Sequence, residues 1–167
     1  VDQDDMPASS VMQRLNGLKA ALGDAGLGVA AMIGEGVPPR PSQQAFARAA
    51  AQEFIRSGGK VDAVFAANDV TAIGVVNGLQ RMGVSVPDDV AVIGFDDLEI
   101  ATYTRPALTT IRQPIRRMGE EAVRRLLARI SDETHSGRPS HILLPPELVI
   151  RESCGARHGG FDDEWIG

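Results

Sequence analysis

Cysteine, aromatic residues and long apolar runs are all scarce or missing in this sequence. Cys154 is the single cysteine, so no intrachain disulfide can form, and a reducing compartment fits this composition. No apolar run approaches the length that crosses a membrane, and the acidic start at residues 1–5 does not resemble a signal peptide. The sequence therefore predicts a cytoplasmic protein without a membrane segment.

Positive charge is also in deficit. The 17 Lys and Arg residues against 22 Asp and Glu residues give a net charge of −5, which argues against this chain alone gripping a phosphate backbone. Hydrophobic residues make up 43% of the 167 residues, as is typical of a globular domain with a real core. We interpret the arginines between Arg116 and Arg129 as a solvated helix face, partly neutralised by Glu120 and Glu121.

The motifs of several enzyme classes are absent. The sequence has neither a Gly-x-Ser-x-Gly elbow nor a phosphate-binding loop that ends in Lys-Ser or Lys-Thr. Gly34-Glu35-Gly36 begins like a dinucleotide fingerprint, but Pro38-Pro39 follows where a helix would have to open. His135, His141 and His158 lack metal-ligand spacing. The sequence therefore predicts no enzymatic activity, no cofactor and no metal site.

The stretch over residues 61–97 has the pattern strand, helix, strand. Residues 61–66 and 90–95 are short apolar runs, typical of parallel strands that are covered on both faces. Residues 69–82 have the length and composition of a helix, and Gly83 stands where a left-handed C-cap would fall.

Polar side chains follow both of these strands. Asn68 and Asp69 follow the first, and Asp96 and Asp97 follow the second. In open α/β sheets, ligands bind just beyond the carboxyl ends of the strands, where such groups can hold hydroxyls. The alternative is that these residues only cap the next helix, and one residue can do both.

Helical and strand patterns alternate along the rest of the chain. Helices are expected over residues 10–25, 42–56 and 114–130, and strands over residues 28–33 and 108–112. Residues 142–144 and 148–150 predict a broken edge strand, and residues 98–105 a short helix or loop. The alternation predicts an α/β fold, a parallel sheet with helices on both faces. The residues expected to face inward are Val11, Leu15, Leu18 and Leu22 in the first helix, Phe46, Ala50 and Phe54 in the second, and Ile115, Met118, Ala122, Leu126 and Ile130 in the third.

Three longer stretches resemble the lactose-repressor/galactose-repressor (LacI/GalR) family of bacterial transcription regulators. They are VDAVFAANDVTAIGVVNGLQRMGVSVPDDVAVIGFDD, RPALTTIRQPIRRMGEEAVRRLL and LLPPELVIRES, and RLNGLKAAL resembles the family segment at its own place. The resemblance implies a type I periplasmic-binding-protein fold, in which two α/β lobes enclose an effector. It implies that this chain holds the second lobe (1–105), a segment returning to the first lobe (106–131) and a strand returning to the second (132–152). The Gly-rich composition of residues 153–167 predicts a flexible tail.

The resemblance also implies which residues contact the effector. Arg14, Asn68, Asp69 and Asp96 match the family's effector-contacting positions or their neighbours, although a helix-surface arginine is the plain alternative for Arg14. Many sugar-binding members carry a stacking aromatic near Arg40, and the loop over residues 34–41 has none. Our hypothesis is that Arg40 helps to bind an anionic effector, such as a sugar acid or a phosphorylated sugar.

Family members act as dimers or tetramers, and their helix-turn-helix domain, which binds DNA, does not lie in this chain. The resemblance implies a dimer surface that includes Ile73, Val76 and Tyr103, with a plain core role as the alternative for Ile73 and Val76. The function it implies is effector sensing in a transcription regulator, and the alternative is a periplasmic sugar-binding protein of a transport system. Residues 108–130 lack their sheet neighbours here, so weak stability and self-association are expected of the isolated chain.

Overall fold

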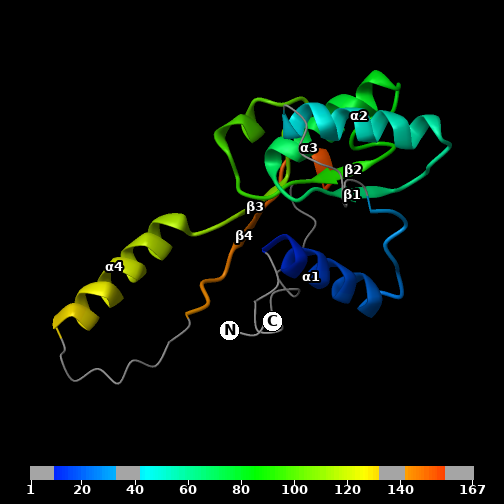
Figure 1. The fold of residues 1–167 in the computed structure, drawn as a ribbon. Coiled ribbons are helices and arrows are strands. Elements are labelled where there is room, and N and C mark those ends of the chain that lie inside the picture. The colour runs from blue at the N-terminus through cyan, green and yellow to red at the C-terminus, as the bar shows by residue number, and fades with distance from the viewer. Residues whose placement is uncertain (1–9, 33–41, 132–141, 157–167) are drawn as a thin grey trace.

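Helices and short strands alternate along the chain (Figure 1). The computed structural model describes residues 10–32, 42–131 and 142–156. None of the helices in these segments is long and apolar enough to cross a membrane. The helices are α1 (Ser10–Asp24), α2 (Gln43–Arg56), α3 (Asp69–Arg81) and α4 (Ile115–Ser131), with 3-10 turns η2 (Glu99–Thr102) and η3 (Glu152–Cys154), and the strands are β1 (Ala63–Phe65), β2 (Ala91–Ile93), β3 (Thr110–Arg112) and β4 (Glu147–Val149).

The strand–helix–strand unit predicted over residues 61–97 is confirmed, with shorter strands than expected. β1 and β2 pair in parallel, and Val64 lies opposite Val92. α3 begins where the Asn68 side chain accepts a hydrogen bond from the Thr71 N–H at 2.9 Å. It ends before Gly83, whose φ of 76° is the left-handed conformation that glycine adopts without steric cost.

α2 packs closely on α3 because small residues line the contact. A Cβ atom placed on Gly78 would lie 2.7 Å from the Arg48 carbonyl oxygen and 2.9 Å from the Ala51 Cβ atom. Ala47 and Ala51 are the buried residues of α2, whereas Phe46 and Phe54 are only half-buried. The predicted inward face of this helix is therefore wrong by one position, since close backbone approach favours alanine over phenylalanine at the contact line.

The start of β3 continues the parallel sheet. Gly94 N–H donates to the Thr109 carbonyl and Asp96 N–H to the Ile111 carbonyl, both at 2.9 Å. β3 then pairs with β4 in antiparallel register, with Ile111 opposite Leu148. The described chain is thus α/β, with a parallel sheet that has α2 and α3 on one side, while α1 lies apart on the other side (Figure 1). The antiparallel β3–β4 pair departs from the all-parallel sheet that was expected, and residues 142–144 form no strand.

Ile73 and Val76 belong to the core of this chain. Their exposed fractions are only 6% and 4%, so the structure contradicts the prediction that they form a dimer surface and supports the core alternative. Their side chains pack under the sheet because this face of α3 is the one turned to it. Tyr103, in contrast, is 71% exposed. The core consists of Ala66, Ala72, Ile73, Val76, Leu79, Val86, Val90, Val92, Ala101 and Leu108.

A seam of buried polar residues joins the C-terminal segment to the sheet. Ser153 Oγ accepts a hydrogen bond from Thr109 N–H at 2.8 Å and donates one to the Val92 carbonyl at 2.6 Å. Arg151 N–H donates to Thr109 Oγ1 at 2.9 Å. Ser153 is fully buried, so the loose tail predicted from this residue onward is wrong at its start. Residues 157–167 lie outside the described residues.

The strand expected over residues 28–33 is wrong for its described part. Residues 28–32 adopt no strand, and no described strand pairs with them. Apolar character alone does not create a strand, because its backbone groups need a neighbour. Ile33 and the loop that carries Arg40 lie outside the described residues. In α1, Leu15, Leu18 and Leu22 are half-buried, whereas Val11 is 50% exposed.

α4 projects away from the rest of the described chain (Figure 1). The helix itself was predicted, but its inward face is not covered, since Ile115, Leu126 and Ile130 are 65%, 59% and 69% exposed. Glu120 pairs with Arg116 at 2.9 Å. Glu121 pairs with Arg125, also at 2.9 Å, and with Arg124, so the two glutamates neutralise part of the arginine face as predicted.

Candidate functional site

The carboxyl ends of β1 and β2 lie side by side and bring the predicted polar residues together. The Asp69 N–H, just after β1, donates to the Phe95 carbonyl, just after β2, at 2.8 Å. Parallel pairing places both strand ends at the same edge of the sheet, and the residues that follow share that edge. The sequence-predicted convergence of these residues is thus present.

Arg14 reaches this edge from α1. Its Nη1 donates to the Ala67 carbonyl at 2.7 Å, and its Cζ lies 3.7 Å from the centroid of the Phe95 ring. This geometry combines a hydrogen bond with a cation–π contact, which together hold the guanidinium flat against the end of the sheet. Arg14 therefore lies at the same sheet edge as the residues that follow β1 and β2, and its contact with an effector stays a prediction.

Asn68 serves as the N-cap of α3, as the capping interpretation predicted. Its Oδ1 accepts from the Thr71 N–H, and its Nδ2 lies 3.5 Å from Gln43 Oε1 on α2. The cap fixes the rotamer of the side chain and leaves the half-buried amide group at the sheet edge. Capping and binding are thus compatible at this residue.

Asp69 occupies the interior. It is fully buried, and its Oδ2 accepts from the Leu98 N–H at 2.7 Å while its Oδ1 accepts from the Thr110 hydroxyl at 2.5 Å. Burial raises the pKa of Asp69, and the hydrogen bonds from Thr110 and Leu98 offset part of that effect. Its carboxylate holds β3 and η2 against α3, so we leave it out of the ligand contacts proposed below.

Asp96 stands at a strained corner of the backbone after β2. Its φ is 107° and that of Asp97 is 51°, both in the region that non-glycine residues rarely adopt. Its Oδ1 accepts a hydrogen bond from Gln113 Nε2 at 2.9 Å. No local pattern singles out Gln113, because its contact with Asp96 depends on β3 lying beside β2.

The Asp97 side chain connects this corner to β3, which precedes α4, and to the segment that follows β4. Its Oδ2 lies 2.6 Å from Arg112 Nε on β3, and its Oδ1 lies 2.5 Å from Arg151 Nη2 after β4. Burial alone would raise the pKa of Asp97, but the hydrogen bonds from Arg151 and Arg112 outweigh it and lower that pKa below its ordinary value. Arg112 pairs further with Glu147 at 3.1 Å. Sequence reasoning missed both arginines, which lie 15 and 54 positions from Asp97.

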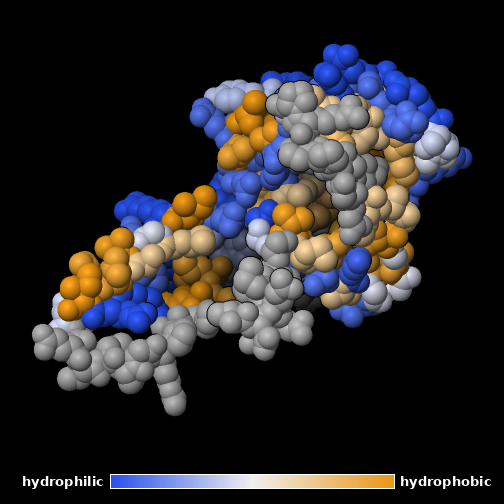
Figure 2. Space-filling view, viewed as in Figure 1, coloured by the Kyte–Doolittle hydropathy of each residue, from blue (hydrophilic) through white to orange (hydrophobic). Residues whose placement is uncertain are grey.

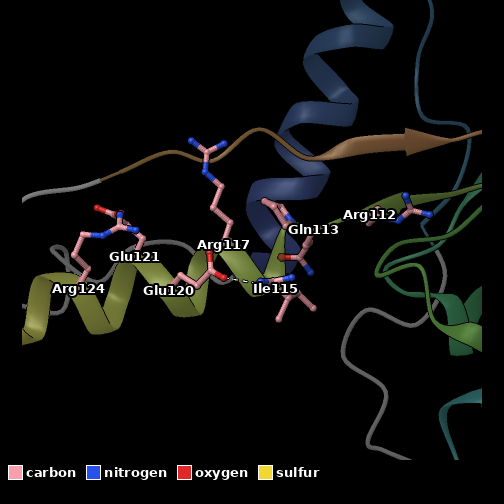
Figure 3. Close-up of a pocket in the computed structure, with 9 residues that line it drawn as sticks. Arg112, Gln113, Ile115, Arg117, Glu120, Glu121 and Arg124 are labelled. Carbon is pink, nitrogen blue, oxygen red and sulfur yellow. Dashed lines mark hydrogen bonds and ion pairs between the residues drawn. The ribbon is translucent and has the colours of Figure 1, made fainter.

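An open pocket of about 690 Å³ lies beside this network, where β3 passes into α4 (Figure 3). Several arginines face it, but Arg112, Arg116 and Arg124 are already paired with carboxylates. The positive charge available in the pocket is therefore lower than a count of its arginines indicates. Its lining is Arg112, Gln113, Pro114, Ile115, Arg116, Arg117, Glu120, Glu121 and Arg124. Among the described residues, no group of three His, Cys, Asp or Glu side chains is placed to hold a metal ion.

An α/β lobe that gathers Arg, Asn and Asp side chains beyond its parallel strand ends defines a ligand-binding domain of the periplasmic-binding-protein type. The profile of the family described as periplasmic binding protein-like domain matches residues 2–154. The chain belongs to this family, and within it corresponds to the effector-binding portion of LacI/GalR-type regulators.

Curated relatives of the chain are transcriptional repressors. The chain is 36% identical over 145 residues to the HTH-type transcriptional repressor PurR of Photobacterium profundum, and the match covers 87% of this chain and 42% of the relative. It is 50% identical over 91 residues to PurR of Vibrio parahaemolyticus, covering 54% of this chain and 27% of the relative. The chain thus spans less than half of the length of these relatives, which are described as regulators rather than enzymes.

Solved structures agree on the fold. A LacI-family regulator from Sanguibacter keddieii matches with a TM-score of 0.74 and 36% identity, over 87% of this chain and 53% of that one. A sugar-binding LacI-family regulator from Escherichia coli, complexed with phosphate, matches at 0.68 and 33%, over 89% and 51%. A LacI-family regulator from Enterococcus faecium with bound ribose matches at 0.68 and 31%, over 88% and 52%.

Proposed function

We propose that the protein is a LacI-type transcription regulator and that this chain binds its small-molecule effector through Arg14, Asn68 and Asp96. The observation that carries the proposal is the convergence of these three side chains at one edge of the sheet, from α1, the start of α3 and the end of β2. DNA contact is then made by a domain outside this chain, in the cytoplasm. The chain catalyses no reaction in this proposal.

The chemistry of the three side chains favours an oxygen-rich ligand. The Arg14 guanidinium carries donors in a fork that matches vicinal oxygens, and the Asn68 amide offers both a donor and an acceptor. Asp96 accepts one described hydrogen bond, at Oδ1, so its second oxygen can accept from a ligand hydroxyl. Because contacts with Ala67, Thr71 and Gln113 hold the three side chains in place, the ligand would meet a largely preformed site.

A sugar or a related anion is the ligand class that we propose. The similarity to a regulator with bound ribose supports a sugar, and the similarity to one complexed with phosphate supports an anion. We propose further that Arg40 contributes to anion binding. An exported sugar-binding protein on the same fold is the second candidate, and the regulators among the relatives favour the first.

A ligand screen by thermal shift, followed by calorimetry, tests the proposal. The intact protein is titrated with D-ribose, cellobiose, D-gluconate and D-ribose 5-phosphate, with a nucleobase as a ligand that offers amide edges but no hydroxyls. Asp96→Asn is expected to weaken binding about tenfold or more, since a charge-assisted hydrogen bond is lost. Asp88→Asn removes the same charge from an exposed turn and is the matched control. Equal binding by both variants would remove Asp96 from the site.

We propose that the protein self-associates through the exposed apolar residues around η2. Leu98, Ile100 and Tyr103 are 40%, 50% and 71% exposed, and they stand close together in sequence on one surface turn. A dimer or tetramer would cover them. Tyr103→Asp is expected to lower the sedimentation coefficient of the intact protein, whereas an unchanged value would exclude this surface.

A further inference from the structure

Two consecutive residues of the candidate site, Asp96 and Asp97, have left-handed backbones. Residues with a Cβ atom keep such a conformation only where the surroundings hold it. The contacts that hold this corner come from β3 and from the segment that follows β4. Asp96 N–H donates to the Ile111 carbonyl at 2.9 Å, and the Asp97 carboxylate is gripped by Arg112 and Arg151.

The Asp97 carboxylate binds a guanidinium from β3 and one from the segment that follows β4. Its side chain is 10% exposed and that of Arg151 is 16% exposed, so these charges are screened far less than a surface pair. Each carboxylate oxygen of Asp97 pairs with one guanidinium: Oδ2 lies 2.6 Å from Arg112 Nε, and Oδ1 lies 2.5 Å from Arg151 Nη2. Without this charge, both guanidiniums lose their ion pair with the residue next to Asp96, while the backbone bonds of the sheet and the Ser153 contacts remain.

We infer that Asp97 is a positioning residue: its ion pairs with Arg112 and Arg151 hold the left-handed corner and so place the neighbouring Asp96 carboxylate for the ligand. The inference rests on the proposed function, because it assigns Asp97 a role in the same site. Both Asp97 carboxylate oxygens are occupied by its two arginines, so in this inference it acts through Asp96 and not by contact.

Amide hydrogen exchange tests the positioning role without any ligand. Asn adopts left-handed φ more readily than most residues, so Asp97→Asn removes the charge while keeping the backbone preference. Exchange at the Asp96 N–H is expected to rise about tenfold, since ion-paired hydrogen bonds of this kind stabilise by about that factor or more. The Ala66 N–H, which donates to the Ile93 carbonyl at 2.9 Å in the same sheet, should keep its rate. Asp88→Asn should change neither rate.

Calorimetry with D-ribose, cellobiose and D-ribose 5-phosphate on the intact protein gives the second measurement. Asp97→Asn is expected to raise the Kd of the bound probe about tenfold, and Asp97→Glu, which restores the charge, should recover part of the loss. Adding Arg112→Gln to Asp97→Asn should raise the Kd no further, because the pair acts as a unit.

The outcomes separate the two hypotheses. If wild type binds none of the probes nor any other ligand of the screen, the proposed function fails, while the exchange rates still decide whether Asp97 holds the corner. If exchange rises equally at Asp96 and Ala66, Asp97 supports the whole fold and the positioning role is wrong. An unchanged Kd beside faster exchange at Asp96 would equally overturn it.

Discussion

Replacing Gly78 by alanine should destabilise the protein, although the same change in most helices stabilises it. Alanine in a helix interior is favoured over glycine by about 0.5–1 kcal/mol, because glycine loses more backbone freedom on folding. At Gly78, however, the new methyl group would lie 2.7 Å from the Arg48 carbonyl oxygen and 2.9 Å from the Ala51 Cβ atom. α2 would have to move away from α3.

The magnitude follows from these two opposing effects. Overpacking of a tight contact costs about 1–3 kcal/mol, which exceeds the helix preference, so Gly78→Ala should lower the free energy of unfolding by about 1 kcal/mol. Gly119 in α4 is the matched control, because a Cβ atom placed there meets nothing within 4 Å. Gly119→Ala should therefore stabilise its helix by about 0.5–1 kcal/mol.

Urea unfolding followed by far-ultraviolet circular dichroism, with thermal melts in parallel, measures both variants. The expected result is a midpoint below that of wild type for Gly78→Ala and one equal to or above it for Gly119→Ala. If Gly78→Ala raises the midpoint as much as Gly119→Ala does, the close approach of α2 and α3 is not a constraint on this sequence.

Four further outcomes are expected. Burial raises the pKa of Asp69, so the folded state binds that proton more tightly than the unfolded state. Stability should therefore fall as the pH rises from 3.8 through the raised pKa. Asp69→Asn should abolish this part of the profile when the unfolding midpoint is measured against pH. The pKa of Asp97 is lowered, so its contribution should be lost only as the pH falls below 3.8. Ser153→Ala removes the acceptor of a buried N–H and should cost about 1–3 kcal/mol in chemical denaturation, whereas Ser57→Ala at an exposed helix end should cost almost nothing. Leu126→Lys, on the apolar stripe of α4 (Figure 2), should reduce self-association of the isolated chain in sedimentation velocity, and an equal oligomer fraction in both proteins would contradict this.

Local signals in the sequence predicted the elements and the polar strand ends. Asn68 before α3 and Gly83 after it act within one helical turn, so their effect is visible from the chain itself. Asp96 follows directly on an apolar strand, and parallel pairing then brings it to the edge that Asn68 shares. The site was predictable as far as it depends on positions at the ends of elements.

Long-range contacts decided the rest. The family resemblance implied that Ile73 and Val76 belong to a dimer surface, with a core role as the alternative, and only the packing of α3 on the sheet decides between the two. The segment over residues 28–32 had strand character without a strand beside it. The grip of Arg112 and Arg151 on Asp97 joins residues from three separate elements, and neither arginine carries a local mark of this role.

The antiparallel pairing of β3 with β4 has a mechanical consequence for α4. The outgoing and the returning chain are hydrogen-bonded into one ribbon, so α4 is mounted on a paired stalk instead of two independent tethers. At the base of this stalk, the Arg112 and Arg151 guanidiniums both pair with the Asp97 carboxylate. The mounting of α4 is therefore connected to the ligand edge through a single aspartate, the neighbour of Asp96.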